Sequence, residues 1–225
     1  GGTPINDMWG MITFDDNTGK KVSRWYYFDG QSTMATGWVY DSKNGNWYYM
    51  NTNEGPDLGQ MVTGWVKDPK TNKWYYMNDN TGILVTGWHL DKQDGRWYYL
   101  NQNGEMLTGW QNIGGKWYYF NSDCKMQTGW ISLSGRWFCL ASDGSLYTSG
   151  VYEIDGKSYY FDSDGVMHTG WVKVGDDWQY FKDDGTRVDK GIVKGDAVYV
   201  IKDGALVTDD KVTVEADKDG AISVM

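Results

Sequence analysis

The residues of this chain that could do chemistry are aromatic, and they recur in two short motifs. One motif is a Gly-Trp pair, and the other is a triplet that most often reads Trp-Tyr-Tyr; the chain has 14 Trp and 17 Tyr in 225 residues. The face of an aromatic ring can attract a cation, stack on a sugar or pack against another ring. The motifs therefore indicate either ring-lined binding sites or an aromatic core.

The spacing of these motifs predicts a tandem array of β-hairpins. The Gly-Trp position falls at Trp38, Trp65, Trp88, Trp110, Trp130, Val151, Trp171 and Ile192. A turn, a triplet and a second turn such as NQNG or DSDG follow in each unit, and this pattern is typical of hairpins. One hairpin alone is marginally stable in water, so neighbouring hairpins must stack. We predict an all-β fold, a solenoid of stacked β-hairpins, with no helices.

The distance between the two Trp of a unit predicts which side chains share a face. The first-strand Trp and the triplet Trp are nine residues apart in the units that start at Trp38, Trp65 and Trp88, and seven apart in those that start at Trp110, Trp130 and Trp171. Because side chains alternate between faces, this even difference keeps both Trp on the same face. We assign the opposite face to structural packing; it carries Tyr48, Tyr75, Tyr98 and Tyr118 with Met50, Met77, Leu100 and Phe120.

The two ends of the chain depart from the repeat. The gap from Trp9 to Trp25 is longer than the others and differs from them in parity, so residues 1–24 are interpreted as a divergent first hairpin or a cap. Residues 25–208 are predicted to be the tandem repeats. Residues 209–225 contain two short apolar runs around a DKDG turn, which predicts a C-terminal capping hairpin.

Charge and composition exclude several classes of partner. A formal net charge of −9 and a pI near 4.6 disfavour nucleic acid and anionic membrane surfaces. No segment is apolar enough to insert into a membrane, and the opening residues GGTPIND lack the regions of a signal peptide, as in a cleaved, secreted fragment. Cys124 and Cys139 leave a disulfide open, because sequence does not show their separation.

Catalytic motifs are missing from the sequence. His89 and His168 have no partner spacing for a metal or a catalytic triad, and we expect both at the surface. The acidic turns lack the spacing of calcium loops. We therefore predict no catalytic residue, no metal and no cofactor. A catalytic domain preceding residue 1 in a longer protein would make this chain its anchor.

The order of TGW, WYY and an Asp/Asn-Gly-x-Met segment resembles choline-binding, or cell-wall-binding, repeats over residues 25–225. Related repeats of glucan-binding and clostridial toxin modules share much of this pattern. The resemblance implies a β-solenoid whose ligand, the choline of teichoic acids, lies between consecutive hairpins. It also implies that two aromatics of a site come from one repeat and a third from the next, with an apolar residue, often Met, nearby.

Transferred to this chain, the family pattern implies four complete sites. Their residues are Trp38, Trp47 and Tyr76; Trp65, Trp74 and Tyr99; Trp88, Trp97 and Tyr119; and Trp130, Trp137 and Tyr160, with Met61 and Met106 as apolar contacts. The remaining sites are expected to be weaker or lost, because Cys139, Val151, Ser158 and Val200 replace aromatic residues in them. Ligand binding should then concentrate in the first two-thirds of the chain.

We therefore expect a secreted, cell-surface module without enzymatic activity that binds choline or phosphocholine multivalently. Two alternatives stay open: a glucan-binding repeat module, and a structural or adhesive rod without a small ligand. The residues before the triplets vary (Asn46, Lys73, Arg96, Lys116, Arg136), and this variation favours choline over a sugar, which needs fixed polar partners. The sequence leaves open whether the chain forms a homodimer through its C-terminal hairpin.

Overall fold

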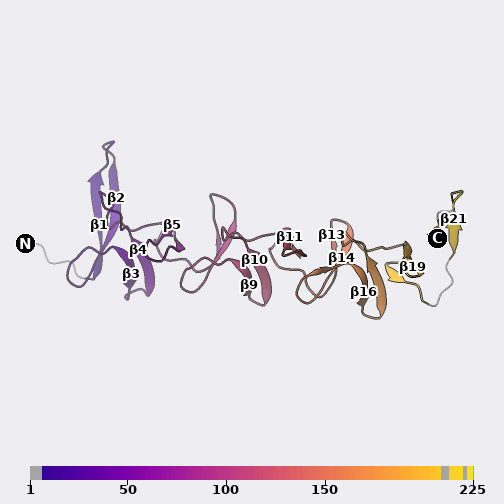
Figure 1. The fold of residues 1–225 in the computed structure, drawn as a ribbon. Coiled ribbons are helices and arrows are strands. Elements are labelled where there is room, and N and C mark those ends of the chain that lie inside the picture. The colour runs from indigo at the N-terminus through magenta and orange to yellow at the C-terminus, as the bar shows by residue number, and fades with distance from the viewer. Residues whose placement is uncertain (1–6, 209–212, 220–221, 225) are drawn as a thin grey trace, which may run out of the picture. The chain divides into compact units, whose positions relative to one another are not determined.

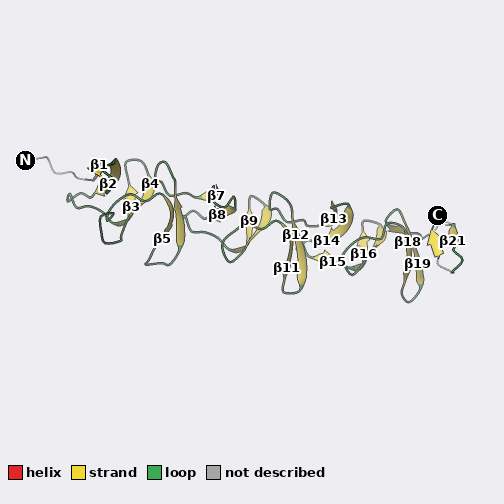
Figure 2. Ribbon diagram, turned by 90° about the horizontal axis from the view of Figure 1, so that it is seen from above, coloured by secondary structure: helices red, strands yellow, loops and turns green. Residues whose placement is uncertain are grey.

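The computed structural model describes residues 7–208, 213–219 and 222–224. Within these ranges the chain consists of strands and turns, and no helix is present (Figure 2). The strands are β1 (Met8–Asp15), β2 (Lys21–Phe28), β3 (Gly37–Asp41), β4 (Asn46–Met50), β5 (Gly64–Lys67), β6 (Trp74–Met77), β7 (Gly87–Leu90), β8 (Trp97–Leu100), β9 (Gly109–Ile113), β10 (Lys116–Phe120), β11 (Gly129–Leu133), β12 (Arg136–Leu140), β13 (Gly150–Ile154), β14 (Lys157–Phe161), β15 (Met167–His168), β16 (Gly170–Val174), β17 (Asp177–Phe181), β18 (Gly191–Lys194), β19 (Val198–Lys202), β20 (Ala205–Leu206), β21 (Val214–Ala216) and β22 (Ile222–Val224). The predicted all-β array of hairpins is confirmed.

Each hairpin is an antiparallel pair of strands that are neighbours in the sequence. The first-strand Trp lies opposite the last residue of the triplet, as in the pairs Trp38↔Tyr49 and Trp65↔Tyr76. The triplet Trp therefore shares a face with both residues, and we call this side of a hairpin its Trp face. The middle residue of the triplet projects from the other side, which we call the back face.

A chain of buried apolar residues runs along the bases of the hairpins. In the hairpins after β1–β2, the residue that follows the triplet is at most 1% exposed, and it pairs with the Gly of the Gly-Trp motif, as for Met50 and Met77. The same residue forms a β-bridge to the apolar residue after the second turn, as in Met50↔Met61 and Met77↔Leu84. These residues supply a core that the hairpin arms lack, because an arm has only two strands.

Within each unit, consecutive hairpins stack with the Trp face of one against the back face of the next. Trp38 contacts Tyr75 at 4.7 Å between ring centroids and 73° between ring planes, an edge-to-face arrangement. The backbone N–H of Leu84 donates to the carbonyl of Trp47 at 2.8 Å, which ties the following repeat to the triplet Trp. The contacts of each hairpin with the next are thus aromatic on the arms and hydrogen-bonded at the base.

The described residues divide into two compact units: residues 1–109 with 120–126, and residues 110–119 with 127–225. The first unit begins with the hairpin of β1 and β2, whose arms are longer than those of β3 and β4 (Figure 1). In the second unit β22 packs against β18 and β19, and Val224 is 5% exposed. Residues 209–212, 220–221 and 225, which belong to the predicted capping hairpin, lie outside the described residues.

Glycines of the second turns approach the apolar residue of the preceding repeat. Gly104 has φ +77°, and a Cβ added there would lie 2.5 Å from Leu84 Cδ1 and 2.9 Å from Leu84 Cγ. Gly87 has a similar φ of +79°, but a Cβ there would meet nothing within 4 Å. Substitution of Gly87 therefore tests backbone strain alone, whereas substitution of Gly104 tests backbone strain together with a steric clash.

We predict that Gly104→Ala destabilises the first unit more than Gly87→Ala. Both changes place a side chain in the left-handed region, at a cost of about 1 kcal/mol each. Gly104→Ala also forces Leu84 to move, which adds roughly 1–3 kcal/mol. Chemical denaturation followed by Trp fluorescence measures both variants, and equal losses of stability would contradict the close approach.

Candidate ligand-binding cages

Three rings and one aliphatic side chain enclose a cavity between the hairpins of β3–β4 and β5–β6. We call it the Trp38 cage, and its walls are Trp38, Trp47, Tyr75 and Leu84. The ring planes of Trp38 and Trp47 are 81° apart with centroids at 6.3 Å, so two indoles meet at a corner. Gln102 and Asn103, in the second turn of the hairpin after that, border a cavity of about 350 Å³.

The same arrangement recurs one hairpin later. The Trp65 cage has the walls Trp65, Trp74, Tyr98 and Met106, with a cavity of about 370 Å³. Cys124 borders it from the second turn of the repeat that carries β9 and β10, where it adopts φ +62° at a position that most other repeats fill with Gly. Burial raises the pKa of the Cys124 thiol, and Cys124 and Cys139 are both free thiols.

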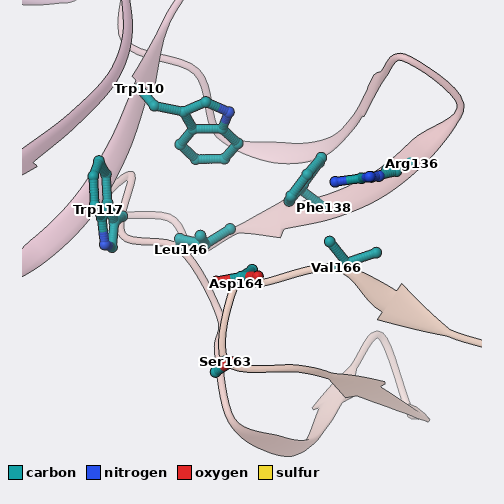
Figure 3. Close-up of a pocket in the computed structure, with 8 residues that line it drawn as sticks. All are labelled: Trp110, Trp117, Arg136, Phe138, Leu146, Ser163, Asp164 and Val166. Atoms are coloured by element: carbon teal, nitrogen blue, oxygen red, sulfur yellow. The ribbon is translucent and has the colours of Figure 1, made fainter.

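The second unit contains two further cages of this kind. The Trp110 cage is formed by Trp110, Trp117, Phe138 and Leu146 (cavity about 340 Å³), and the Trp171 cage by Trp171, Trp178, Tyr199 and Leu206 (about 300 Å³). Figure 3 shows the rings of Trp110 and Trp117 beside Leu146 and Phe138, with Ser163 and Asp164 entering from a separate turn. Arg136 also lines the Trp110 cage and adds a cation to its rim.

Two more predicted Trp pairs keep this geometry in part. Trp88 and Trp97 lie 6.1 Å apart at 88°, close to the values for Trp38 and Trp47. Trp130 contacts Tyr159 at 4.7 Å, and Trp137 is 47% exposed. In every complete cage the triplet Trp is about half exposed, so one indole face is available to a ligand while the first-strand Trp is partly covered.

The third wall of the cages is not the residue that the family pattern implied. Tyr76, Tyr99 and Tyr119 each pack on the first-strand Trp of their own hairpin, at centroid distances of 4.7, 5.1 and 5.0 Å. Tyr160 likewise lies opposite Val151 in its own hairpin. The middle residue of the triplet forms the wall instead, because the Trp face of one hairpin meets the back face of the next. Tyr75 and Tyr98, which we assigned to packing alone, are therefore cage walls.

Two cages that were expected to lack their third ring are therefore complete. Cys139 pairs with Trp130 inside its own hairpin, and Phe138 supplies the ring of the Trp110 cage. Val200 pairs with Ile192, and Tyr199 supplies the ring of the Trp171 cage at 5.1 Å from Trp171. Complete cages thus extend beyond the first two-thirds of the chain.

One cage position has lost all four of its walls. Val151 and Ser158 replace the two Trp, Gln179 replaces the ring, and Arg187 replaces the apolar residue. Arg187 still donates its backbone N–H to the Ser158 carbonyl at 2.8 Å, so the repeat geometry is unchanged. Its guanidinium donates to Gln179 Oε1 at 3.2 Å and to Asp189 Oδ1 at 2.7 Å. A polar cluster therefore occupies the position of an aromatic cage.

The first hairpin supplies a set of walls that sequence analysis missed. Trp9 contacts Tyr48 at 4.6 Å and 68°, and Met61 donates its backbone N–H to the Trp25 carbonyl at 2.8 Å. Trp9 and Trp25 share the Trp face because Trp9 lies opposite Tyr27 and Met11 lies opposite Trp25. A longer turn absorbs the difference in parity. Met61 therefore belongs with Trp9, Trp25 and Tyr48, and Met106 lines the Trp65 cage.

The chain itself contained a signal for the missed walls. The middle triplet position keeps a ring in all triplets except at Gln179, whereas the last position loses its ring twice, at Cys139 and Val200. The middle rings are Tyr26, Tyr48, Tyr75, Tyr98, Tyr118, Phe138, Tyr159 and Tyr199. A change from Tyr to Phe preserves the ring and removes the hydroxyl, which is typical of a position that needs an aromatic surface. Leu84, Leu146 and Leu206 follow the second turns at the position of Met106.

Polar contacts hold the turns beside the cages. The Tyr98 hydroxyl donates to Asp94 at 2.7 Å, and burial together with this carboxylate raises the pKa of Tyr98, so its hydroxyl stays protonated. Lys73 contacts Glu105 at 2.5 Å, and this bond lowers the pKa of Glu105. Both partners of this ion pair are partly exposed, so we expect a small contribution to stability. Within the described part of the chain, no cluster of His, Cys, Asp and Glu could hold a metal ion.

The chain shows no helix among its described residues that could cross a membrane. The fold and the repeated cages define a class of protein, namely an all-β repeat array with aromatic cages between its hairpins. Known families agree with this class. The model of the choline-binding repeat matches residues 17–58, 107–150 and 148–191, and that of the cell wall binding repeat matches residues 63–83 and 86–106. The chain belongs to the choline-binding repeat family.

Solved structures of similar sequence share this fold. CbpJ of Streptococcus pneumoniae TIGR4 is 32% identical with a TM-score of 0.77, and the match covers 91% of this chain and 72% of CbpJ. Choline binding protein F of Streptococcus pneumoniae is 31% identical with a TM-score of 0.73, over 92% and 72% of the two chains; it has also been solved in the presence of a peptidoglycan analogue. The choline-binding domain of CbpL from the same species is 25% identical with a TM-score of 0.62, over 90% and 98%. No curated protein matches the chain.

His89 was expected at the surface, but it packs between rings under the Trp65 cage. Its ring lies 3.8 Å from that of Tyr76 and 5.5 Å from that of Trp65. Its Nε2 is buried and has no hydrogen-bond partner among the described residues. Burial lowers the pKa of His89, and this effect outweighs the opposite influence of Asp91 and Asp79.

We predict that His89 destabilises the fold at acidic pH. An unfolded His titrates near pH 6.5, above the lowered pKa of the folded state, so the unfolded chain binds more protons as the pH falls below about 6.5. His89→Val, which copies Val66 of the preceding hairpin, should therefore gain stability relative to wild type at about pH 5 compared with about pH 7.5. Denaturation midpoints of both proteins at the two pH values measure this, and a difference that is independent of pH would contradict it.

Proposed function

We propose that this chain is a non-catalytic cell-wall-binding module that captures choline groups of teichoic acids in its aromatic cages, several at a time. The recurrence of one cage, with two indoles, a third ring and an aliphatic wall, is the observation that carries the proposal. The family of the chain and the peptidoglycan analogue present in a structure of choline binding protein F support a cell-wall ligand.

The cage fits the chemistry of a quaternary ammonium group. Such a group has no N–H to donate, so its best partners are the negative faces of several rings, each worth about 0.5–2 kcal/mol. Trp38, Trp47 and Tyr75 provide three rings around one space, and Leu84 provides an apolar wall for the methyl groups. The cavity volumes of about 300–370 Å³ lie at the small end of ligand pockets, which suits a trimethylammonium head group.

A neutral sugar fits the cages less well. A sugar bound against Trp needs polar side chains at fixed positions beside the ring. The polar residues that border the cages differ: Gln102 and Asn103 at the Trp38 cage, Ser122 and Asp123 at the Trp65 cage, and Arg136, Ser163 and Asp164 at the Trp110 cage. The constant features are aromatic and aliphatic, and these favour a compact cation.

Repetition of the cages gives affinity for a polymer that a single cage lacks. Linked weak sites that bind a repeating ligand gain avidity of about 10²- to 10⁴-fold. Wall polymers that carry choline at intervals are ligands of this kind. A secreted location at the cell wall, a role as the anchor of a larger enzyme, and a homodimer through residues 209–225 belong to the same proposal.

The chain should bind an immobilised choline or tertiary-amine resin and be eluted by free choline. The same preparation passed over dextran and starch resins tests the glucan alternative. Retention on the glucan resins alone would refute the choline proposal, and retention on none of the resins would favour a structural rod.

Trp47→Ser should remove one choline site with little change in stability. Trp47 is 45% exposed, and the chain itself has Ser158 at the same position in a cage without aromatic walls. Isothermal titration should show about one site fewer than in wild type. Phe14→Ser is the matched control, because Phe14 is 37% exposed and lies outside the cages. An unchanged number of sites in Trp47→Ser would contradict the assignment of this wall.

A further inference from the structure

A buried carboxylate accepts the indole N–H of the first-strand Trp in three successive hairpins. Each carboxylate comes from the hairpin that follows the Trp in the sequence. The bonds are Trp9 Nε1 to Asp41 Oδ2 at 2.9 Å, Trp38 Nε1 to Asp68 Oδ2 at 3.1 Å, and Trp65 Nε1 to Asp91 Oδ2 at 2.5 Å. The three aspartates are only 4%, 4% and 6% exposed. Each therefore places a carboxyl group out of solvent at the N–H edge of a first-strand indole.

The second oxygen of each aspartate is held by its own turn. Oδ1 of Asp68 accepts the backbone N–H of Lys70 at 2.9 Å, and Oδ1 of Asp91 accepts that of Gln93 at 2.6 Å. Burial by itself would raise the pKa of Asp68, but the hydrogen bonds from Lys70 and Trp38 outweigh it, so the pKa lies below its ordinary value. The carboxylate is consequently ionised at neutral pH and fixed in position.

Other cages lack this acid. It requires the longer turn at the end of the first strand, and it lies three residues after the first-strand Trp of its hairpin. In the later, shorter hairpins the same position holds Leu133, Ile154 and Gly195, which correspond to Trp110, Trp130 and Trp171. The Trp110 and Trp171 cages thus have three rings and an aliphatic wall without a carboxylate at this position.

A carboxylate at the N–H edge of an indole increases the negative potential of the ring face. The charge acts through the protein interior, where screening is weaker than in water. A cation on the ring face gains from this potential, whereas an uncharged molecule of the same shape does not. Cages with and without the acid should then differ in their preference for a charged ligand, although their ring walls are alike.

We propose that Asp68 and Asp91 are specificity-determining residues, which tune the Trp38 and Trp65 cages for a cationic ligand over a neutral one of equal size, and that Asp41 acts in the same way on the rings around Trp9. This inference rests on the proposed function of the cages. It divides the array into cages whose indole bonds to a buried acid, which select for positive charge, and cages without that acid such as the Trp171 cage, which select mainly for shape.

Asp68→Asn tests this inference in the Trp38 cage, because Asn keeps the size of the side chain and one acceptor oxygen but removes the charge. The ligands are choline and its uncharged carbon analogue 3,3-dimethyl-1-butanol. The ¹H–¹⁵N signal of the Trp47 indole, assigned by Trp→Phe substitution, reports occupancy of this cage separately from the others. Asp68→Asn should weaken choline binding about threefold to tenfold and leave binding of the neutral alcohol unchanged.

Asp16→Asn is the matched control. Asp16 also accepts backbone N–H groups of its turn, from Thr18 at 2.8 Å and Lys20 at 2.9 Å, but it lies in the exposed turn of the first hairpin and bonds to no indole in the described structure. Both ligands should bind the Trp38 cage of this variant as in wild type.

Three outcomes separate the hypotheses. Equal weakening of both ligands by Asp68→Asn would show that the acid only supports the structure, and unchanged choline binding would overturn the inference while leaving the cages as choline sites. Absence of choline binding to any cage of the wild type would overturn the proposed function and the inference with it. A comparison within the wild type needs no variant. The preference for choline over the alcohol should be larger at Trp47 than at Trp178, whose cage has no charged lining residue, and equal preferences would contradict the inference.

Discussion

The structure depends on one aromatic contact, the edge-to-face packing of a first-strand Trp against a ring on the back face of the next hairpin. The contact recurs with centroid distances of 4.6 to 5.1 Å from Trp9–Tyr48 to Trp171–Tyr199. A two-stranded arm has no interior, so each hairpin must use its neighbour as the other half of a core. Because only one face of a hairpin carries the Trp residues, all hairpins of a unit stack in the same direction, Trp face against back face.

Packing between hairpins and the lining of the cages use different rings of the same motif, so an aromatic-rich chain can contain both a core and open cavities. The first-strand Trp is partly covered by the next hairpin, while the triplet Trp, such as Trp47, is about half exposed. The back-face ring does both, since Tyr75 packs on Trp38 and lines the cavity beside Trp47. A cage is therefore a space between two neighbouring hairpins that their packed rings do not fill.

The repeats are alike in geometry and unlike in chemistry. Hairpins with a shorter first turn lack the buried carboxylate. At the cage position of Arg187 all four wall residues are replaced and a polar cluster forms, but the backbone hydrogen bond from Arg187 is retained. A shared backbone frame lets individual positions change without disturbing neighbours, because each repeat contacts mainly the repeats beside it. The chemistry between neighbouring hairpins can thus differ from one repeat to the next.

The sequence alone determined the all-β hairpin array, the pairing of both Trp on one face and the aromatic character of the sites, because alternation at period two is a local property of strands. It could not determine which side of the next hairpin faces those Trp. For this reason the predicted third wall of the Trp38 cage was Tyr76, whereas the structure has Tyr75 there. The sequence also did not show that Trp9 shares a face with Trp25. The spacing of these two residues differs in parity from that of the other Trp pairs, so only the pairing of the strands reveals their common face. The indole–carboxylate bonds join residues about 30 positions apart through stacking. Only tertiary structure decided these points, because stacking direction is a relation between hairpins and is not encoded in the period of any one strand.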